Sequence, residues 1–131
     1  MRSEGIDKVL LADDDTGVRQ TAAEILRLAG HEVLEAQDGM VALEMLESNQ
    51  ISVLVLDVLM PRADGIAVLE ALDALPVTVV ASAFAVEPDA RERLGTKVFA
   101  YLKKPVPPDR LIEAVESALA HASQGGATAA E

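Results

Sequence analysis

The chain has 131 residues, half of them hydrophobic, and carries a formal net charge of −11 with no cysteine. We therefore expect one domain with a proper hydrophobic core, and a disordered chain is excluded. The acidic surplus argues against direct binding of nucleic acid or anionic lipid, and the lack of cysteine excludes disulfide bonds, thiolate chemistry and Cys-ligated zinc.

The start of the chain has no apolar core of the signal-peptide kind, because residues 1–7 are mostly polar. No apolar run in the sequence approaches the roughly 18 residues of a membrane span. We therefore expect a cytoplasmic protein with no membrane partner.

The first part of the chain predicts a strand, a helix and a second strand. Residues 8–12 are apolar and end in an acidic triplet, as a buried strand does at a turn. A helix follows that Asp15 or Thr16 can cap and that Gly30 ends. Residues 32–36 predict a second strand, and its acidic residues suggest the edge of a sheet.

The middle of the chain continues the alternation. Asp38-Gly39 turns the chain into a helix over about residues 40–47. Residues 52–57 form an apolar, mostly branched run that ends abruptly in Asp57, which is typical of a strand buried on both faces. After a loop that contains Pro61, a third helix is expected from about residue 65 to residue 75.

The last part of the chain predicts two more strands and two more helices. Residues 77–82 are rich in β-branched side chains and predict strand four. A short helix is expected over residues 87–94, strand five over 98–102, and a last helix from Pro107-Pro108 onward. We expect one domain over residues 1–122, followed by a Gly- and Ala-rich segment, 123–131, that is either a disordered tail or the start of a linker.

Alternation of five strands with five helices predicts an α/β fold, a doubly wound (βα)5 parallel sheet with helices on both faces. Right-handed crossovers favour the flavodoxin-like strand order 2-1-3-4-5, with a switch point between strands one and three. Because the carboxyl ends of parallel strands meet at one edge, Asp13 and Asp14 should lie beside Asp57, with Ser82 and Lys104 farther along the same rim.

This set of residues resembles the receiver domain of two-component response regulators over about residues 6–122. The matching residues are the acidic pair Asp13-Asp14, Asp57 with Met60-Pro61 and Gly65 after it, Ser82-Ala83, Tyr101 and Lys104-Pro105. Each motif alone is weak, but their order and spacing together are specific. The resemblance also implies a cis peptide bond between Lys104 and Pro105.

The resemblance implies that Asp57 accepts a phosphoryl group from a sensor histidine kinase or a histidine phosphotransfer protein. Asp57 is then the nucleophile that forms an acyl phosphate, Lys104 is a cation for a phosphoryl oxygen, and Ser82 donates a hydroxyl hydrogen bond. Such a domain is not a conventional enzyme, but it promotes its own phosphorylation and dephosphorylation.

The resemblance further implies a divalent cation, Mg²⁺ or Mn²⁺. Oxygen-only ligands suit these ions, and clustered carboxylates repel one another unless a cation is bound. By resemblance, Asp14, Asp57 and the backbone carbonyl of Leu59 bind the metal directly, and Asp13 helps through water. Leu59 and Phe84 flank the phosphoryl site and are apolar, so we expect a long-lived phosphate.

The resemblance implies a switch in which Ser82 is drawn toward the phosphate and Tyr101 moves inward. This changes the face formed by the fourth helix, the fifth strand and the fifth helix, which would bind a downstream protein, a missing output domain or a second copy in a dimer. Lys97-Val98 and Ala100 depart from the usual pattern here, so the family analogy is weakest on this face.

Two alternatives stay open at this point. The first is a pseudo-receiver, which has the same fold but binds partners without being phosphorylated; the intact Asp14, Asp57, Ser82 and Lys104 argue against it. The second is a phosphatase of the haloacid dehalogenase type, which places Asp-x-Asp-x-Thr/Val after its first strand. The present sequence departs from that pattern at Gly17.

Overall fold

The computed structural model describes residues 7–57, 70, 74–83 and 86–124. Its elements are β1 (Lys8–Ala12), α1 (Thr16–Leu28), β2 (Glu32–Ala36), α2 (Gly39–Ser48), β3 (Val53–Leu56), β4 (Val77–Ser82), α4 (Pro88–Leu94), the 3-10 turn η1 (Gly95–Lys97), β5 (Ala100–Lys103) and α5 (Pro108–Ser123). The helix expected over 65–75 and the segment 125–131 lie outside the described residues.

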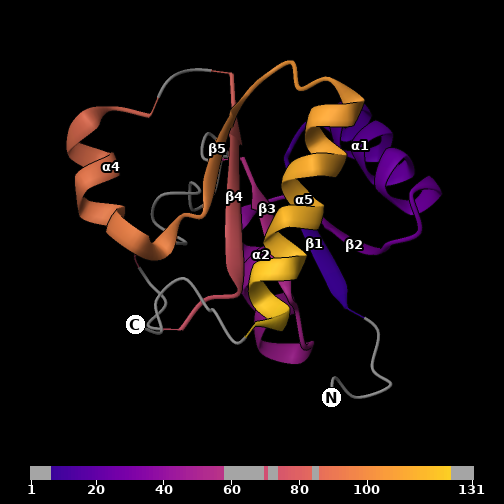
Figure 1. Ribbon diagram of the computed structural model, residues 1–131, viewed down its shortest axis with the longest axis horizontal. Coiled ribbons are helices and arrows are strands. Elements are labelled where there is room, and N and C mark those ends of the chain that lie inside the picture. Colours follow the sequence, from indigo (N-terminus) through magenta and orange to yellow (C-terminus); the bar gives the residue numbers. More distant parts are fainter. Residues whose placement is uncertain (1–6, 58–69, 71–73, 84–85, 125–131) are drawn as a thin grey trace.

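The five strands form one parallel sheet in the order β2-β1-β3-β4-β5 (Figure 1). The strand order and the (βα)5 fold class expected from the sequence are therefore confirmed. Strand β1 lies between β2 and β3, with Val9 opposite Val33 on one side and Val53 on the other. This arrangement puts the switch point between β1 and β3, as expected.

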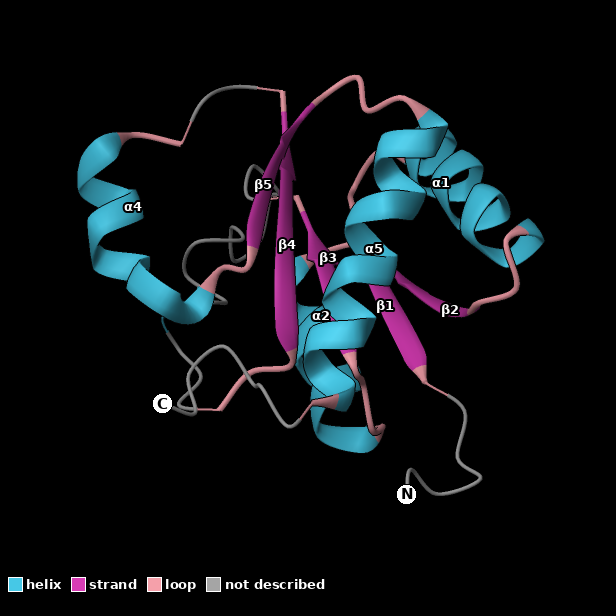
Figure 2. Cartoon of the chain, in the orientation of Figure 1, coloured by secondary structure: helices cyan, strands magenta, loops and turns pink. Residues whose placement is uncertain are grey.

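Helices cover both faces of the sheet because successive side chains of a buried strand point to opposite faces. Figure 2 shows α4 on the opposite side of β4 and β5 from α1 and α5. The core beneath α1 and α5 includes Val9, Leu11, Leu26, Val55 and Val115. The core on the other face, with α2 and α4, includes Leu10, Ala42, Leu54, Leu56 and Leu94.

Side-chain caps begin two helices close to where the sequence places them. The Asp15 side chain accepts a hydrogen bond from the Val18 N–H at 3.0 Å, so Asp15 is the N-cap of α1. The Asp38 side chain does the same for α2, accepting from the Val41 N–H at 2.9 Å. Gly30, at φ 102°, follows α1 in the left-handed region that ends helices.

Strand β5 differs most from its expected bounds, since it begins at Ala100 rather than at residue 98. The 3-10 turn η1 takes up Gly95–Lys97 after α4, and although the backbone of Val98 is extended, the chain bends again at Phe99 before the strand begins. The Phe99 N–H donates to the Thr78 carbonyl at 2.7 Å, and the paired residues of the strand begin only after it.

Strands β1, β2 and β4 have the bounds expected from the sequence, and the other elements apart from β5 differ by about one residue at one or both ends. Strand β3 is shorter than expected by a residue at each end, and α5 continues through Ser123. None of the helices in the described ranges has the length and the apolar composition needed to cross a membrane.

Candidate functional site

The carboxyl ends of four strands bring polar side chains to one rim of the sheet. Asp57 directly follows β3, and its N–H donates to the Ala12 carbonyl at 3.0 Å, which holds it beside the end of β1. The Lys104 N–H donates to the Ser82 carbonyl at 2.8 Å and so ties the end of β5 to that of β4. The rim expected from the strand order is therefore present.

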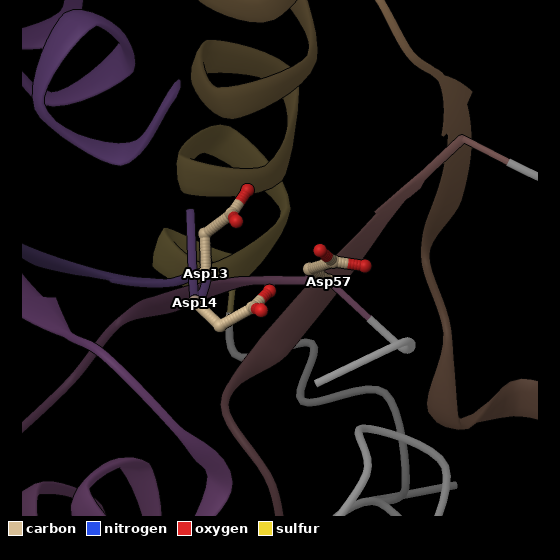
Figure 3. Close-up of side chains that lie close together, drawn as sticks. All are labelled: Asp13, Asp14 and Asp57. Carbon is tan, nitrogen blue, oxygen red and sulfur yellow. The ribbon is translucent and has the colours of Figure 1, made fainter. Parts of the chain in front are cut away.

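Three carboxylates gather at this rim (Figure 3). One oxygen each from Asp13, Asp14 and Asp57 lies within 4.8 Å of the other two. Asp13 and Asp57 are buried, whereas Asp14 is exposed. These oxygen donors suit Mg²⁺ or Mn²⁺, and the exposed side leaves room for the waters that Mg²⁺ usually keeps. The donor set therefore fits a hard divalent cation.

Lys104 bridges two of these acids with one ammonium group. Its Nζ donates to Asp13 Oδ2 at 2.5 Å and to Asp57 Oδ2 at 3.1 Å. Burial alone would lower the pKa of Lys104, but the hydrogen bonds and charges of Asp13 and Asp57 outweigh burial and raise it. Lys104 is therefore a cation throughout the physiological pH range.

The environment of Asp13 acts on its carboxyl in both directions. Burial is the largest influence and raises the pKa of Asp13 above its usual value. Hydrogen bonds from Lys104 and from the Asp15 N–H oppose this rise, the latter reaching Asp13 Oδ1 at 2.9 Å. Both carboxylate oxygens of Asp13 therefore already accept hydrogen bonds from the protein.

Arg19 holds the backbone of the acidic segment that begins at Asp13, and this role was not predicted from the sequence. Its Nη1 donates to the Asp13 carbonyl at 2.9 Å, and its Nε donates to Glu35 at 3.0 Å. Arg19 lies on the buried stripe of α1 with Ala23 and Leu26. An arginine at that spacing was the available signal, because a buried charge needs a partner.

The two expected switch residues lie on β4 and β5. Ser82 is buried at the end of β4, and Tyr101 is half-buried on β5 opposite Val80. The guanidinium of Arg91 covers the Tyr101 ring, with Cζ 3.9 Å from the ring centroid. Burial raises the pKa of the Tyr101 hydroxyl, and the charge of Arg91 opposes part of that rise.

An apolar cavity of about 670 Å³ opens beside the acids, between α1 and α5. Its lining includes Val18, Ile25 and Val106, and Asp57 and Lys104 also border it. Val18 is 44% exposed. The apolar surface therefore adjoins the charged site directly.

One further expectation for the site is confirmed, and several others fall on residues that the structure does not describe. The Lys104–Pro105 peptide bond is cis, as the resemblance implied. Leu59, Phe84, Met60-Pro61 and Gly65 lie outside the described residues.

Comparison with known proteins gives one family. The family model for the response regulator receiver domain matches residues 9–116. The transcriptional regulatory protein PdtaR of Mycobacterium tuberculosis (strain ATCC 25618 / H37Rv) is 35% identical over 115 residues, which cover 86% of this chain and 56% of PdtaR. The response regulator MprA of Mycobacterium sp. (strain KMS) is 33% identical over 120 residues, which cover 88% of this chain and 52% of MprA. The chain thus spans about half the length of these relatives.

Solved structures agree with this result. The receiver domain of the Francisella response regulator 1452 is 31% identical with a TM-score of 0.80, covering 88% of this chain and 98% of that one. A receiver domain protein (CheY-like) from Methanospirillum hungatei JF-1 has a TM-score of 0.83 at 23% identity. The match covers 93% of this chain and 100% of that one. The second likeness supports the fold alone.

Proposed function

Because the chain belongs to the response regulator receiver domain family, whose members are signalling domains rather than conventional enzymes, we propose that Asp57 accepts a phosphoryl group. The donor is a phosphohistidine of a sensor kinase or of a phosphotransfer protein. The observation that carries this proposal is the position of Asp57, buried at the end of β3 within reach of Lys104 and of the Asp13-Asp14 pair.

In the proposed transfer, a carboxylate oxygen of Asp57 forms a bond to phosphorus while the P–N bond to the donor imidazole breaks. The electron pair of that bond leaves with the imidazole. The Lys104 ammonium donates a hydrogen bond to Asp57 before the transfer. It then donates to a phosphoryl oxygen as negative charge builds up on that oxygen. The Ser82 hydroxyl donates a hydrogen bond to another phosphoryl oxygen. Together they promote both phosphorylation and dephosphorylation.

Mg²⁺ or Mn²⁺ is the proposed cofactor, and when bound it would neutralise the clustered carboxylates and the charge of the phosphoryl oxygens. We assign the direct contacts to Asp14, Asp57 and the Leu59 carbonyl, and a water-mediated contact to Asp13. The hydrogen bonds on both oxygens of Asp13 support its indirect role, because neither oxygen is free to bind a metal without losing a partner.

Partners of the domain follow from its surfaces. The apolar cavity beside Asp57, with the exposed Val18, is the proposed docking place for the donor protein. Phosphorylation would pull Ser82 toward the phosphate and Tyr101 inward, changing the face of α4, β5 and α5. That face would then bind a downstream protein, an output domain or a second copy, and the reaction would take place in the cytoplasm.

The function can be tested with a small phosphodonor, acetyl phosphate, in the presence of Mg²⁺. Intact mass should rise by one phosphoryl group in the natural chain and in D15N, which removes a neighbouring acid but keeps a capping side chain. The adduct should be lost in D57N and after chelation of Mg²⁺. If the natural chain takes up no phosphoryl group, the proposal is wrong and a phosphorylation-independent binding module takes its place.

A further inference from the structure

Arg91 and Tyr101 form a contact that no expected role of the domain uses. Arg91 lies on α4, a helix of seven residues whose N-cap makes no side-chain hydrogen bond. Its guanidinium stacks over the ring of Tyr101 on β5, with Cζ 3.9 Å from the centroid. Besides the buried Ala90 and Leu94 of this helix, the contact therefore adds one exposed side chain, Arg91, between a short, weakly capped helix and the sheet.

A small cavity lies directly beside this contact. Its volume is about 150 Å³, and its lining includes Ser82, Tyr101 and Arg91 together with the apolar Val80 and Val86. An apolar cavity of about this volume is large enough to accept a benzene ring. The cavity that Ser82 and Tyr101 both border therefore has enough volume for a six-membered ring.

We propose that Arg91 is a positioning residue that holds Tyr101 out of this cavity and so sets the resting balance of the switch. The inference rests on the proposed function, since it concerns the same Ser82 and Tyr101. The ring can enter the cavity only when the stack on Arg91 is given up, because Arg91 covers its face and lines the same space. The stack on Arg91 and the inward position of the ring therefore exclude each other, and stabilising one lowers the population of the other.

The size of this bias follows from the nature of the contact. An exposed cation–π pair shifts a two-state equilibrium by roughly two- to five-fold. Arginine suits this role better than lysine because its planar guanidinium stacks on an aromatic face. Loss of Arg91 should therefore raise the ratio of inward to outward rings by roughly two- to five-fold, with R91K intermediate.

The ring itself can be followed without phosphorylation. Tyr101 is the sole tyrosine and there is no tryptophan, so the tyrosine emission of the full chain comes from this residue alone. Acrylamide should quench R91A less than the natural chain, because the ring has moved into the cavity. The matched control is R93A, which also removes one positive charge from α4. The guanidinium of Arg93 pairs with Glu70 and not with Tyr101.

The direction of the quenching change decides between two explanations. If Arg91 only covers the ring, its removal uncovers Tyr101 and quenching rises. Unchanged or increased quenching in R91A relative to R93A overturns the inference, and reduced quenching supports it.

A second measurement links the ring to the site. The initial rate of Asp57 phosphorylation by acetyl phosphate should rise roughly two- to five-fold in R91A and stay unchanged in R93A. In a Y101A background the same R91A change should have no effect, as a double-mutant cycle requires for direct coupling. An R91A effect that persists in Y101A, or no rate change in R91A, overturns the inference. If the natural chain forms no adduct, the proposed function fails, and the quenching result still decides whether Arg91 holds the ring.

Discussion

Lys104 and Asp57 are joined by a hydrogen bond of 3.1 Å, while the same ammonium group also donates to Asp13 at 2.5 Å. A cation that belongs to the protein thus already compensates two of the three clustered carboxylates. Any metal ion that binds there must compete with Lys104 for negative charge, so Lys104 has a different effect on metal binding than on phosphoryl transfer.

Replacing Lys104 by methionine should separate these two effects. We expect K104M to bind Mg²⁺ more tightly, on the order of tenfold, because the competing ammonium is gone and the acids repel one another. Phosphorylation of Asp57 should nevertheless slow by roughly 10²- to 10³-fold, as when one charge-stabilising donor is removed. Calorimetric titration and the rate of adduct formation measure the two quantities. K103M, at the exposed neighbouring position, should change neither, and weaker Mg²⁺ binding in K104M would contradict the competition.

Removing the Arg19 side chain should loosen the acidic segment. Arg19 binds the carbonyl of Asp13, and the partners behind metal ligands typically account for about 10- to 100-fold in metal affinity. We expect R19Q to weaken Mg²⁺ binding by about tenfold in calorimetric titration. R27Q is the control, because Arg27 shares Glu35 and binds the Val33 carbonyl without touching Asp13. Equal affinities of R19Q and R27Q would show that Arg19 does not position the site.

The ionisation of Tyr101 can be measured directly from its ultraviolet absorbance, since it is the sole tyrosine. Burial raises its pKa above the usual value of a tyrosine hydroxyl, and the charge of Arg91 opposes part of that rise, so R91A should shift the midpoint still higher. The neutral hydroxyl is favoured in the fold, so the corresponding stability is fully present below pH 10 and is lost as pH rises through the folded pKa. A midpoint in R91A below that of the natural chain would contradict this account.

The lifetime of the phosphate should depend on two apolar positions, Leu59 and Phe84. Neither side chain can hydrogen-bond an attacking water, and Phe84 could keep water out. We expect release of phosphate from the loaded protein with Mg²⁺ to be faster in L59N and in F84E than in the natural chain. Timed loss of the adduct by intact mass tests this, and equal or slower release in both variants would remove the basis of the prediction.

Much of the site was predictable because the chain carries strong local signals. Buried parallel strands appear as short apolar runs, and the residue after each run must lie at the carboxyl edge of the sheet. That reasoning brings Asp13, Asp57, Ser82 and Lys104 together without any structure. The cis bond at Pro105 came from the family resemblance instead, since an X-Pro bond alone favours trans.

Contacts between side chains of different elements were less predictable, because they depend on rotamers and on how helices seat on the sheet. The start of β5 at Ala100 is one case, since it depends on a 3-10 turn that leaves no clear pattern in the sequence. Arg19 is another, because its partners Asp13 and Glu35 belong to a strand end and to a different strand.

By itself, the sequence determined the strand order and the gathering of carboxylates beside Lys104, because apolar periodicity and right-handed crossovers leave few other solutions. Only the tertiary structure decided which acids Lys104 bridges, which arginine supports Asp13 and which one covers Tyr101. These are choices among several nearby charged groups of the same kind. Distances of a few ångströms decide between them, and packing alone sets those distances.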